Sequence, residues 1–184
     1  GLSDKYGRKV LLFASSILFI IGSLMSAFAP DFIIMVTARI ILGLAVGSAS
    51  ALTPTYLAEL SPKERRGSLE SLFQLMITAG ILLAYVANIG LLNHNIAGWA
   101  DWRWMLATAI LPALALFIGS IVLPESPRFL MRKGRKDESH QVLIQLRPTY
   151  TAEEINSELH DIENADTEVN KGGVRELFSI ARPA

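Results

Sequence analysis

Long stretches without charge alternate with short charged connections along this chain. The charge-free runs cover 21, 30 and 21 residues, at 10–30, 71–100 and 104–124, and residues 32–58 carry a single charge, on Arg39. A membrane-spanning helix needs about 20 mostly apolar residues to cross ~30 Å of hydrocarbon. The pattern therefore predicts four transmembrane helices, at residues 10–29, 32–57, 69–92 and 103–123.

Composition supports this division. The chain is 51% hydrophobic and 18% charged, and residues 125–184 hold 20 of its 34 charges. We therefore expect an all-α integral membrane protein with a membrane part at 1–124 and a polar part at 125–184, rather than one soluble domain or a disordered chain. A signal peptide with a cleavage site near Ala29 is the alternative for the first span. Its apolar run would exceed the usual 7–15 residues.

Basic residues occur in every second connection. Lysine and arginine precede the first predicted span, separate the second from the third and follow the fourth, whereas the other two connections, at Pro30–Asp31 and 93–101, have none. Cytoplasmic loops carry the excess of basic residues in membrane proteins. We therefore expect a multi-pass protein of the cell membrane with both ends of this segment in the cytoplasm.

Arg39 lies about eight residues into the second span, ~12 Å along the helix from its outer end. A charged side chain inside a bilayer costs at least ~2.5–3.5 kcal/mol. That cost is tolerable if the guanidinium meets an acid or a polar cavity, or if it extends to the headgroups. No acid lies at the same depth in the four spans, so we expect an acidic partner on a further helix outside this chain.

Two amides lie in the third span, Gln74 and Asn88. The Gln74 amide offers two donors and an acceptor, which suits a polyhydroxylated ligand. A hydrogen bond between helices is the equal alternative, worth ~0.6 kcal/mol. Gly43 and Gly47 allow close helix packing.

Acids and arginines recur together in the three basic connections. The segments are Asp4–Lys9, Glu59–Gly67 and Pro124–Arg128. They are either solvated loops that set the topology or an ion-pair cluster that closes a cytoplasmic gate. Exposed pairs contribute only ~0–1 kcal/mol each, so only a network would matter.

The polar part predicts short helices. Thr151 and Glu154 have the spacing of a capping box at the start of one of them. Residues 166–173 have the composition of a linker, and a further helix is expected at 174–180.

The sequence favours neither catalysis nor a cofactor. It has no cysteine, no Gly-rich phosphate loop and no cluster of metal ligands, and its net charge is zero. We therefore expect no metal or other cofactor and no nucleic-acid partner. The expectation of no enzyme follows from the function predicted below, in which no bond is made or broken.

Four segments resemble the sugar porter family of the major facilitator superfamily. They are Asp4-x-x-Gly7-Arg8-Lys9, Arg39 with Gly43, Gly47 and Pro54-x-Tyr56-Leu57-Ala58-Glu59, the loop from Glu59 to Arg66-Gly67, and Pro124-Glu125-Ser126-Pro127-Arg128-Phe129-Leu130. The resemblance implies that 1–124 corresponds to helices 3–6 of a twelve-helix fold and 125–184 to its intracellular helices. The remaining helices would be partners of this segment.

The resemblance also implies roles for single residues. Gln74 would bind sugar hydroxyls, Ile77 would lie beside it, and Ile81 stands where some members have a second glutamine. Arg39 would take part in proton coupling through an acid on helix 1. The cytoplasmic gate would be formed by Asp4, Arg8, Glu59, Arg66, Glu125 and Arg128.

These roles predict transport of a monosaccharide, a hexose or a pentose, by proton-coupled symport. A facilitator without ion coupling, a sugar sensor with a transporter-like body and a four-helix membrane scaffold are the alternatives.

Overall fold

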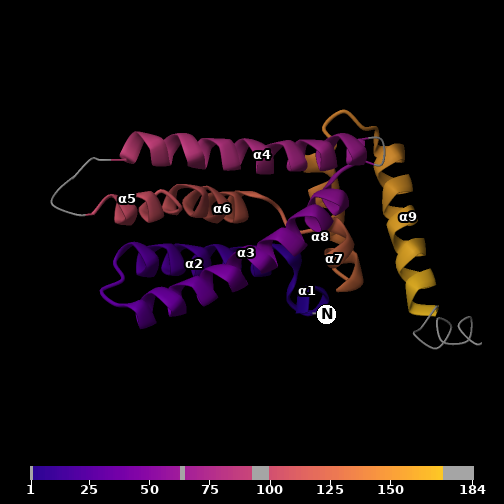
Figure 1. Cartoon of the computed structure of the whole chain (residues 1–184). Helices are drawn as coiled ribbons and strands as arrows, with labels where there is room; N and C mark the ends of the chain where they lie inside the picture. The colour runs from indigo at the N-terminus through magenta and orange to yellow at the C-terminus, as the bar shows by residue number, and fades with distance from the viewer. Residues whose placement is uncertain (1, 63–64, 93–99, 172–184) are drawn as a thin grey trace, which may run out of the picture. The chain divides into compact units, whose positions relative to one another are not determined.

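Figure 1 shows the protein as a computed structural model, which describes residues 2–62, 65–92 and 100–171, and for Leu2, Asp4 and 165–171 the backbone only. The described chain is helical and divides into two compact units, Gly1–Pro124 and Glu125–Ala184. Each unit is described by itself below.

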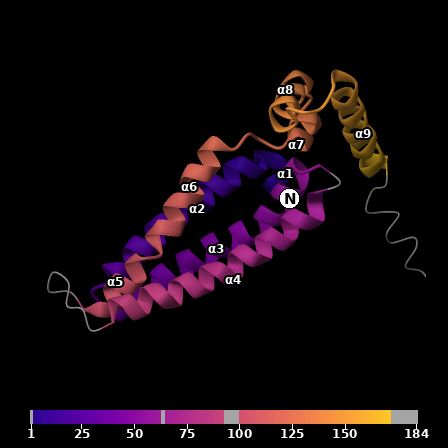
Figure 2. The same cartoon turned by 90° about the horizontal axis from the view of Figure 1, so that it is seen from above.

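The first unit contains the membrane-spanning helices. A short helix α1 (Leu2–Tyr6) precedes α2 (Arg8–Ala27), α3 (Phe32–Leu60), α4 (Arg66–Leu91) and the pair α5 (Asp101–Ala107) and α6 (Ile110–Val122). Four helical segments of the described chain are long and apolar enough to cross a membrane, counting Asp101–Val122 as one. The prediction of four spans is therefore confirmed, and Figures 1 and 2 show them running side by side.

Small residues on α2 allow its neighbours to approach closely. Gly22 is buried against α3, and a methyl group added there would meet the Leu42 side chain at 2.8 Å and its backbone nitrogen at 3.2 Å. Farther along the same interface, the hydroxyls of Ser15 and Ser48 lie 2.8 Å apart and share a hydrogen bond. α2 packs against α3 and also against α6, where the rings of Phe13 and Phe117 lie 5.2 Å apart.

The fourth span is interrupted between α5 and α6. Pro112 has no backbone N–H, so the carbonyl of Thr108 lacks its usual helical donor. That carbonyl accepts instead from the N–H of Leu111 at 3.1 Å, which tightens the turn at 108–109.

α4 is the most exposed of the long helices, since none of its residues is buried. Its exposed side chains are largely apolar and include Leu75, Leu82, Leu83 and Ile89. Such a surface suits lipid or other helices, which are the environments of a membrane span.

The second unit consists of α7 (Pro127–Arg132), α8 (Lys136–Leu146) and α9 (Ala152–Lys171). Its core is formed by Leu143 of α8 and by Ile155 and Ile162 of α9. The buried Arg147 donates to the Glu158 carboxylate at 3.2 Å and joins the end of α8 to α9.

α9 begins at the predicted capping box and extends farther than expected. The Glu154 carboxylate accepts from the Thr151 N–H at 2.7 Å, and the Thr151 hydroxyl accepts from the Glu154 N–H at 3.3 Å. The linker prediction is wrong for residues 166–171, which continue the helix because they contain no proline or glycine. Residues 172–173 and the helix expected at 174–180 lie outside the described residues.

Candidate transport site and buried ion pair

A cavity of about 510 Å³ opens among the membrane helices of the first unit. Residues of α2, α3, α4, α5 and α6 line it, most of them apolar. Three polar side chains of its wall come from three different helices: Ser26, Arg39 and Asn88. The cavity is therefore an apolar space with a few convergent polar groups, the usual composition of a small-molecule site.

Polar atoms in this wall have hydrogen-bonding capacity left over. The Ser26 hydroxyl and the Asn88 carbonyl oxygen are buried and have no hydrogen-bond partner among the described residues. Buried polar atoms are nearly always satisfied in native proteins. The two oxygens therefore retain unused hydrogen-bonding capacity within the helix packing around the cavity.

Arg39 lies in this wall, on the second turn of α3. Within the described part of the chain its guanidinium forms no ion pair, in keeping with the absence of a membrane acid at its depth. An arginine inside a span that faces a cavity is the arrangement in which its charge is tolerated.

Gln74, Ile77 and Ile81 follow one another at i, i+3 and i+7 and so share one face of α4. All three are exposed, Ile77 at 41% and Ile81 at 55%, and none of them lines the cavity with Arg39. The structure thus places these candidate sugar contacts together, and apart from Arg39.

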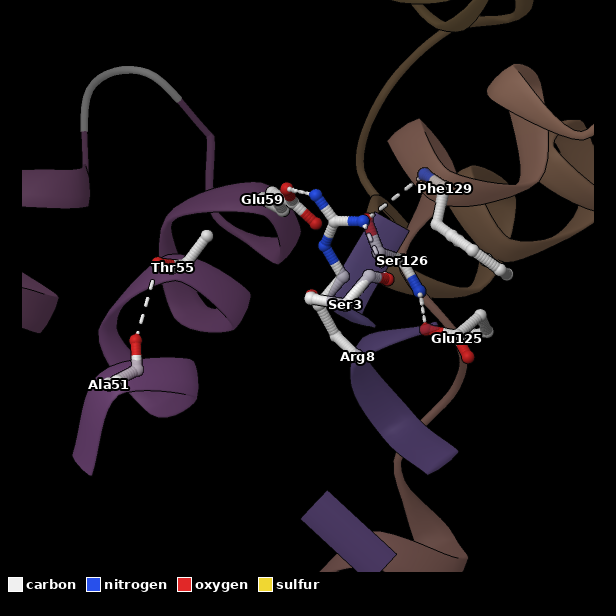
Figure 3. Close-up of polar contacts among 8 residues, drawn as sticks. All are labelled: Ser3, Arg8, Ala51, Thr55, Glu59, Glu125, Ser126 and Phe129. Atoms are coloured by element: carbon white, nitrogen blue, oxygen red, sulfur yellow. Dashed lines mark hydrogen bonds and ion pairs between the residues drawn. The ribbon is translucent and has the colours of Figure 1, made fainter. Parts of the chain in front are cut away.

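Arg8 and Glu59 form the one ion pair of the expected cytoplasmic network that the described contacts of the first unit contain. The Arg8 guanidinium donates to the Glu59 carboxylate at 2.9 Å, and the two side chains are only 5% and 10% exposed (Figure 3). The same guanidinium donates to the Ser3 carbonyl at 3.3 Å. This pair joins the start of α2 to the end of α3.

Two further contacts at this end of the bundle were missed by sequence reasoning. The Lys9 ammonium donates to the Ile121 carbonyl at 2.9 Å, and the hydroxyl of the buried Tyr56 donates to the Pro124 carbonyl. Each satisfies a carbonyl at the end of α6 that has no partner within the helix. A tyrosine that ends an apolar span was the available signal, because its hydroxyl requires a partner when buried.

Arg103 forms a similar contact at the opposite end. Its guanidinium donates to the Ala29 carbonyl at 3.1 Å and lies 5.0 Å from the centre of the Trp102 ring. Arg103, near the expected outer face, therefore satisfies a backbone carbonyl that lies just after the end of α2.

The other expected members of the charge network are placed as follows. Arg66 is half-buried at the first position of α4, and the side chain of Asp4 lies outside the described residues. In the second unit, the Glu125 carboxylate accepts from the Ser126 N–H at 3.0 Å (Figure 3). Arg128 follows in the first turn of α7.

Four apolar spans with an arginine in the wall of the cavity among them, and a buried ion pair that joins two of these spans, indicate a helical membrane protein of the transporter class. The chain belongs to the family described as "Sugar (and other) transporter", whose model matches residues 1–182.

Relatives of this chain include proteins named as sugar transporters. It is 47% identical over 184 residues to the D-xylose transporter of Levilactobacillus brevis and 45% identical over 161 residues to the galactose-proton symporter of Escherichia coli. These alignments cover 99% and 88% of this chain, but only 39% and 33% of the two relatives. The chain therefore spans about two fifths or less of the length of these relatives.

A solved structure shows the same fold. The major facilitator superfamily proton:xylose symporter XylE of E. coli, bound to 6-bromo-6-deoxy-D-glucose, matches with a TM-score of 0.85 and 30% identity. The match covers 96% of this chain and 41% of that one. The described helices therefore form part of a major facilitator superfamily fold.

Proposed function

We propose that this protein transports a monosaccharide, a hexose or a pentose, across the cell membrane by alternating access coupled to protons. The observation that carries the proposal is an arginine, Arg39, facing a membrane cavity in a chain of the sugar transporter family. Relatives named for xylose and for galactose with protons support the substrate class and the coupling. Both ends of the described segment lie in the cytoplasm in this proposal, because its basic connections lie there.

Sugar binding is assigned to one face of α4. The Gln74 amide donates to and accepts from sugar hydroxyls, and Ile77 and Ile81 form the apolar surface beside it. The three residues share this exposed face, so one ligand can contact all of them. Arg39 acts separately, from the cavity wall, by pairing with an acid on another helix. Deprotonation of that acid forms the pair and protonation releases it.

The sugar assignment is tested by Gln74→Ala in the transporter reconstituted in proteoliposomes. Loss of one amide that binds ligand hydroxyls is expected to weaken sugar affinity at least tenfold, ~1.4 kcal/mol. Leu75→Ala, at the exposed neighbouring position on another face of α4, is the matched control and should leave affinity unchanged. Equal affinities in the wild type and Gln74→Ala would remove Gln74 from the site.

Proton coupling is tested at Arg39. In wild-type proteoliposomes an inward proton gradient should drive sugar accumulation, whereas Arg39→Ala should retain sugar exchange at equilibrium and lose accumulation. A wild type that exchanges sugar without accumulating it would be a facilitator. A wild type that binds sugar and shows no counterflow would be a sensor, and the transport proposal would then be wrong.

A further inference from the structure

Positive and negative charges are unevenly distributed in the second unit. Residues 128–136 contain five lysines and arginines and no acid, whereas residues 153–163 of α9 contain five acids and no lysine or arginine. The two sets lie on different helices of one compact unit. The basic residues of this unit are therefore concentrated in α7 and the turn that follows it, and most of its acids lie on α9.

A tight turn gathers the basic residues. Gly134 has a φ of +74°, the N–H of Arg135 donates to the Leu130 carbonyl at 3.0 Å, and the N–H of Gly134 donates to the Met131 carbonyl at 2.9 Å. This is a Schellman-type ending of α7, for which glycine is strongly favoured. It reverses the chain within a few residues, so the cations of the turn between α7 and α8 lie around one loop. We call these four the basic turn: Arg132, Lys133, Arg135 and Lys136.

The basic turn is accessible. Arg132 and Lys133 are exposed, and the side chains of Arg135 and Lys136 are 53% and 61% exposed. Arg135 pairs with Glu138 and Lys136 with Glu163, and both acids are about half exposed. Exposed pairs of this kind contribute only ~0–1 kcal/mol. A phosphate oxygen can therefore replace either carboxylate at little cost.

The turn is also tethered close to a bilayer. The membrane-spanning segment ends at Val122, and Arg132 follows ten residues later, with α7 accounting for six of those residues. Basic clusters immediately beyond a transmembrane helix are attracted to anionic lipids by ~1 kcal/mol per lysine or arginine.

We infer that the basic turn is a binding surface for the phosphate headgroups of anionic lipids. Arginine supplies the bidentate contact to phosphate and lysine the point charge. The surface lies in the second unit and is separate from the sugar and proton sites. Basic residues in a loop after a membrane span also influence the orientation of the chain in the membrane. That effect would not require the residues to be exposed or to be gathered by the turn at Gly134.

The test compares backbone amide exchange of residues 127–146 in nanodiscs of phosphatidylcholine and in nanodiscs with 30% phosphatidylglycerol. The protein should exchange at least fivefold more slowly in these residues with phosphatidylglycerol, and 0.5 M NaCl should abolish the difference, because salt screens exposed charges. Both leaflets contain the anionic lipid, so the result depends neither on the orientation of the chain nor on its substrate.

The triple variant Arg132→Gln, Lys133→Gln, Arg135→Gln should lose the slowing and exchange as the wild type does in phosphatidylcholine. Lys5→Gln with Arg65→Gln is the matched control, because it removes exposed cations from the first unit. That double variant should keep the full response. Equal exchange in the two lipids, or a full response in the triple variant, would overturn the inference.

Soluble glycerol phosphate added to the phosphatidylcholine discs distinguishes a bilayer from a free anion. It should not slow exchange, and slowing equal to that by phosphatidylglycerol would assign the turn to a soluble phosphate ligand. The salt comparison needs no substitution, so it decides the question even if the triple variant is unstable.

Discussion

The buried ion pair between α2 and α3 provides a quantitative test of the fold. Arg8 and Glu59 are 2.9 Å apart and at most 10% exposed, so neither charge is well solvated if the other is removed. Removing one partner of a buried pair costs about 3–5 kcal/mol. Two unit charges about 4 Å apart attract by about 4 kcal/mol at an effective dielectric constant near 20, which is of the same size.

We therefore expect Glu59→Leu and Arg8→Met each to lower the free energy of unfolding by about 3–5 kcal/mol. The double variant should recover most of that loss, because two apolar side chains of similar size leave no uncompensated charge. The coupling between the two sites should thus be about 3 kcal/mol or more and opposite in sign to the single effects.

The assay is unfolding of the detergent-solubilised protein by increasing mole fractions of sodium dodecyl sulfate, followed by far-ultraviolet circular dichroism. Lys5→Met removes an exposed cation near the same end of the bundle and is the control, with an expected change within about 0.5 kcal/mol. If the two single effects simply add in the double variant, the side chains do not interact, and the pair does not hold α2 to α3.

Three further predictions concern packing, helix ends and pH. Gly22→Ala should destabilise the first unit by about 1–3 kcal/mol in the same assay, because its new methyl group overlaps Leu42, whereas Gly43→Ala, with nothing within 4 Å, should not; equal effects would refute the close contact. Tyr56→Phe should cost about 1 kcal/mol by leaving the Pro124 carbonyl unsatisfied, and Tyr85→Phe, at an exposed position, should be neutral. The Thr151 backbone and side chain lower the pKa of Glu154 below its ordinary value. The stability that this carboxylate adds to α9 is therefore fully present above the ordinary pKa and is lost as the pH falls through the lowered pKa. Amide exchange of residues 152–164, measured between pH 6 and 3, would show this loss. Glu154→Gln should remove that pH dependence because it has no carboxylate to titrate, whereas Thr151→Ala should only reduce it, since the Thr151 N–H still donates; an unchanged profile in Glu154→Gln would contradict the capping box.

The membrane helices were predictable because their signal is local. A charge-free run of sufficient length predicts a span whatever its neighbours, and charged or turn residues such as Asp31 mark the ends: Asp31 caps α3 by accepting from the Ile34 N–H at 2.9 Å. The second span was expected to begin at Phe32, and α3 begins there.

Contacts between helices were much less accessible from the sequence. The importance of Gly22 depends on the position of Leu42 across the interface, and Gly43 and Gly47, which have the more recognisable spacing, meet nothing within 4 Å. The cavity wall includes Ser26, Arg39 and Asn88, which come from three helices. Their spacing along the chain does not predict that they line the same cavity. The roles of Gln74, Ile77, Ile81 and Arg39 remain predictions that the variants above address.

Pro54 makes α3 easier to bend near its C-terminal end. The ring removes the donor that the Ser50 carbonyl would use, and the flanking threonine hydroxyls donate to neighbouring carbonyls, Thr53 to Ala49 at 2.7 Å and Thr55 to Ala51 at 3.5 Å (Figure 3). A helix with a missing rung bends more easily there than elsewhere. The segment of α3 after Pro54 bears both Tyr56 and Glu59, which contact Pro124 and Arg8. Bending of α3 at Pro54 would therefore move both contacts at the same time.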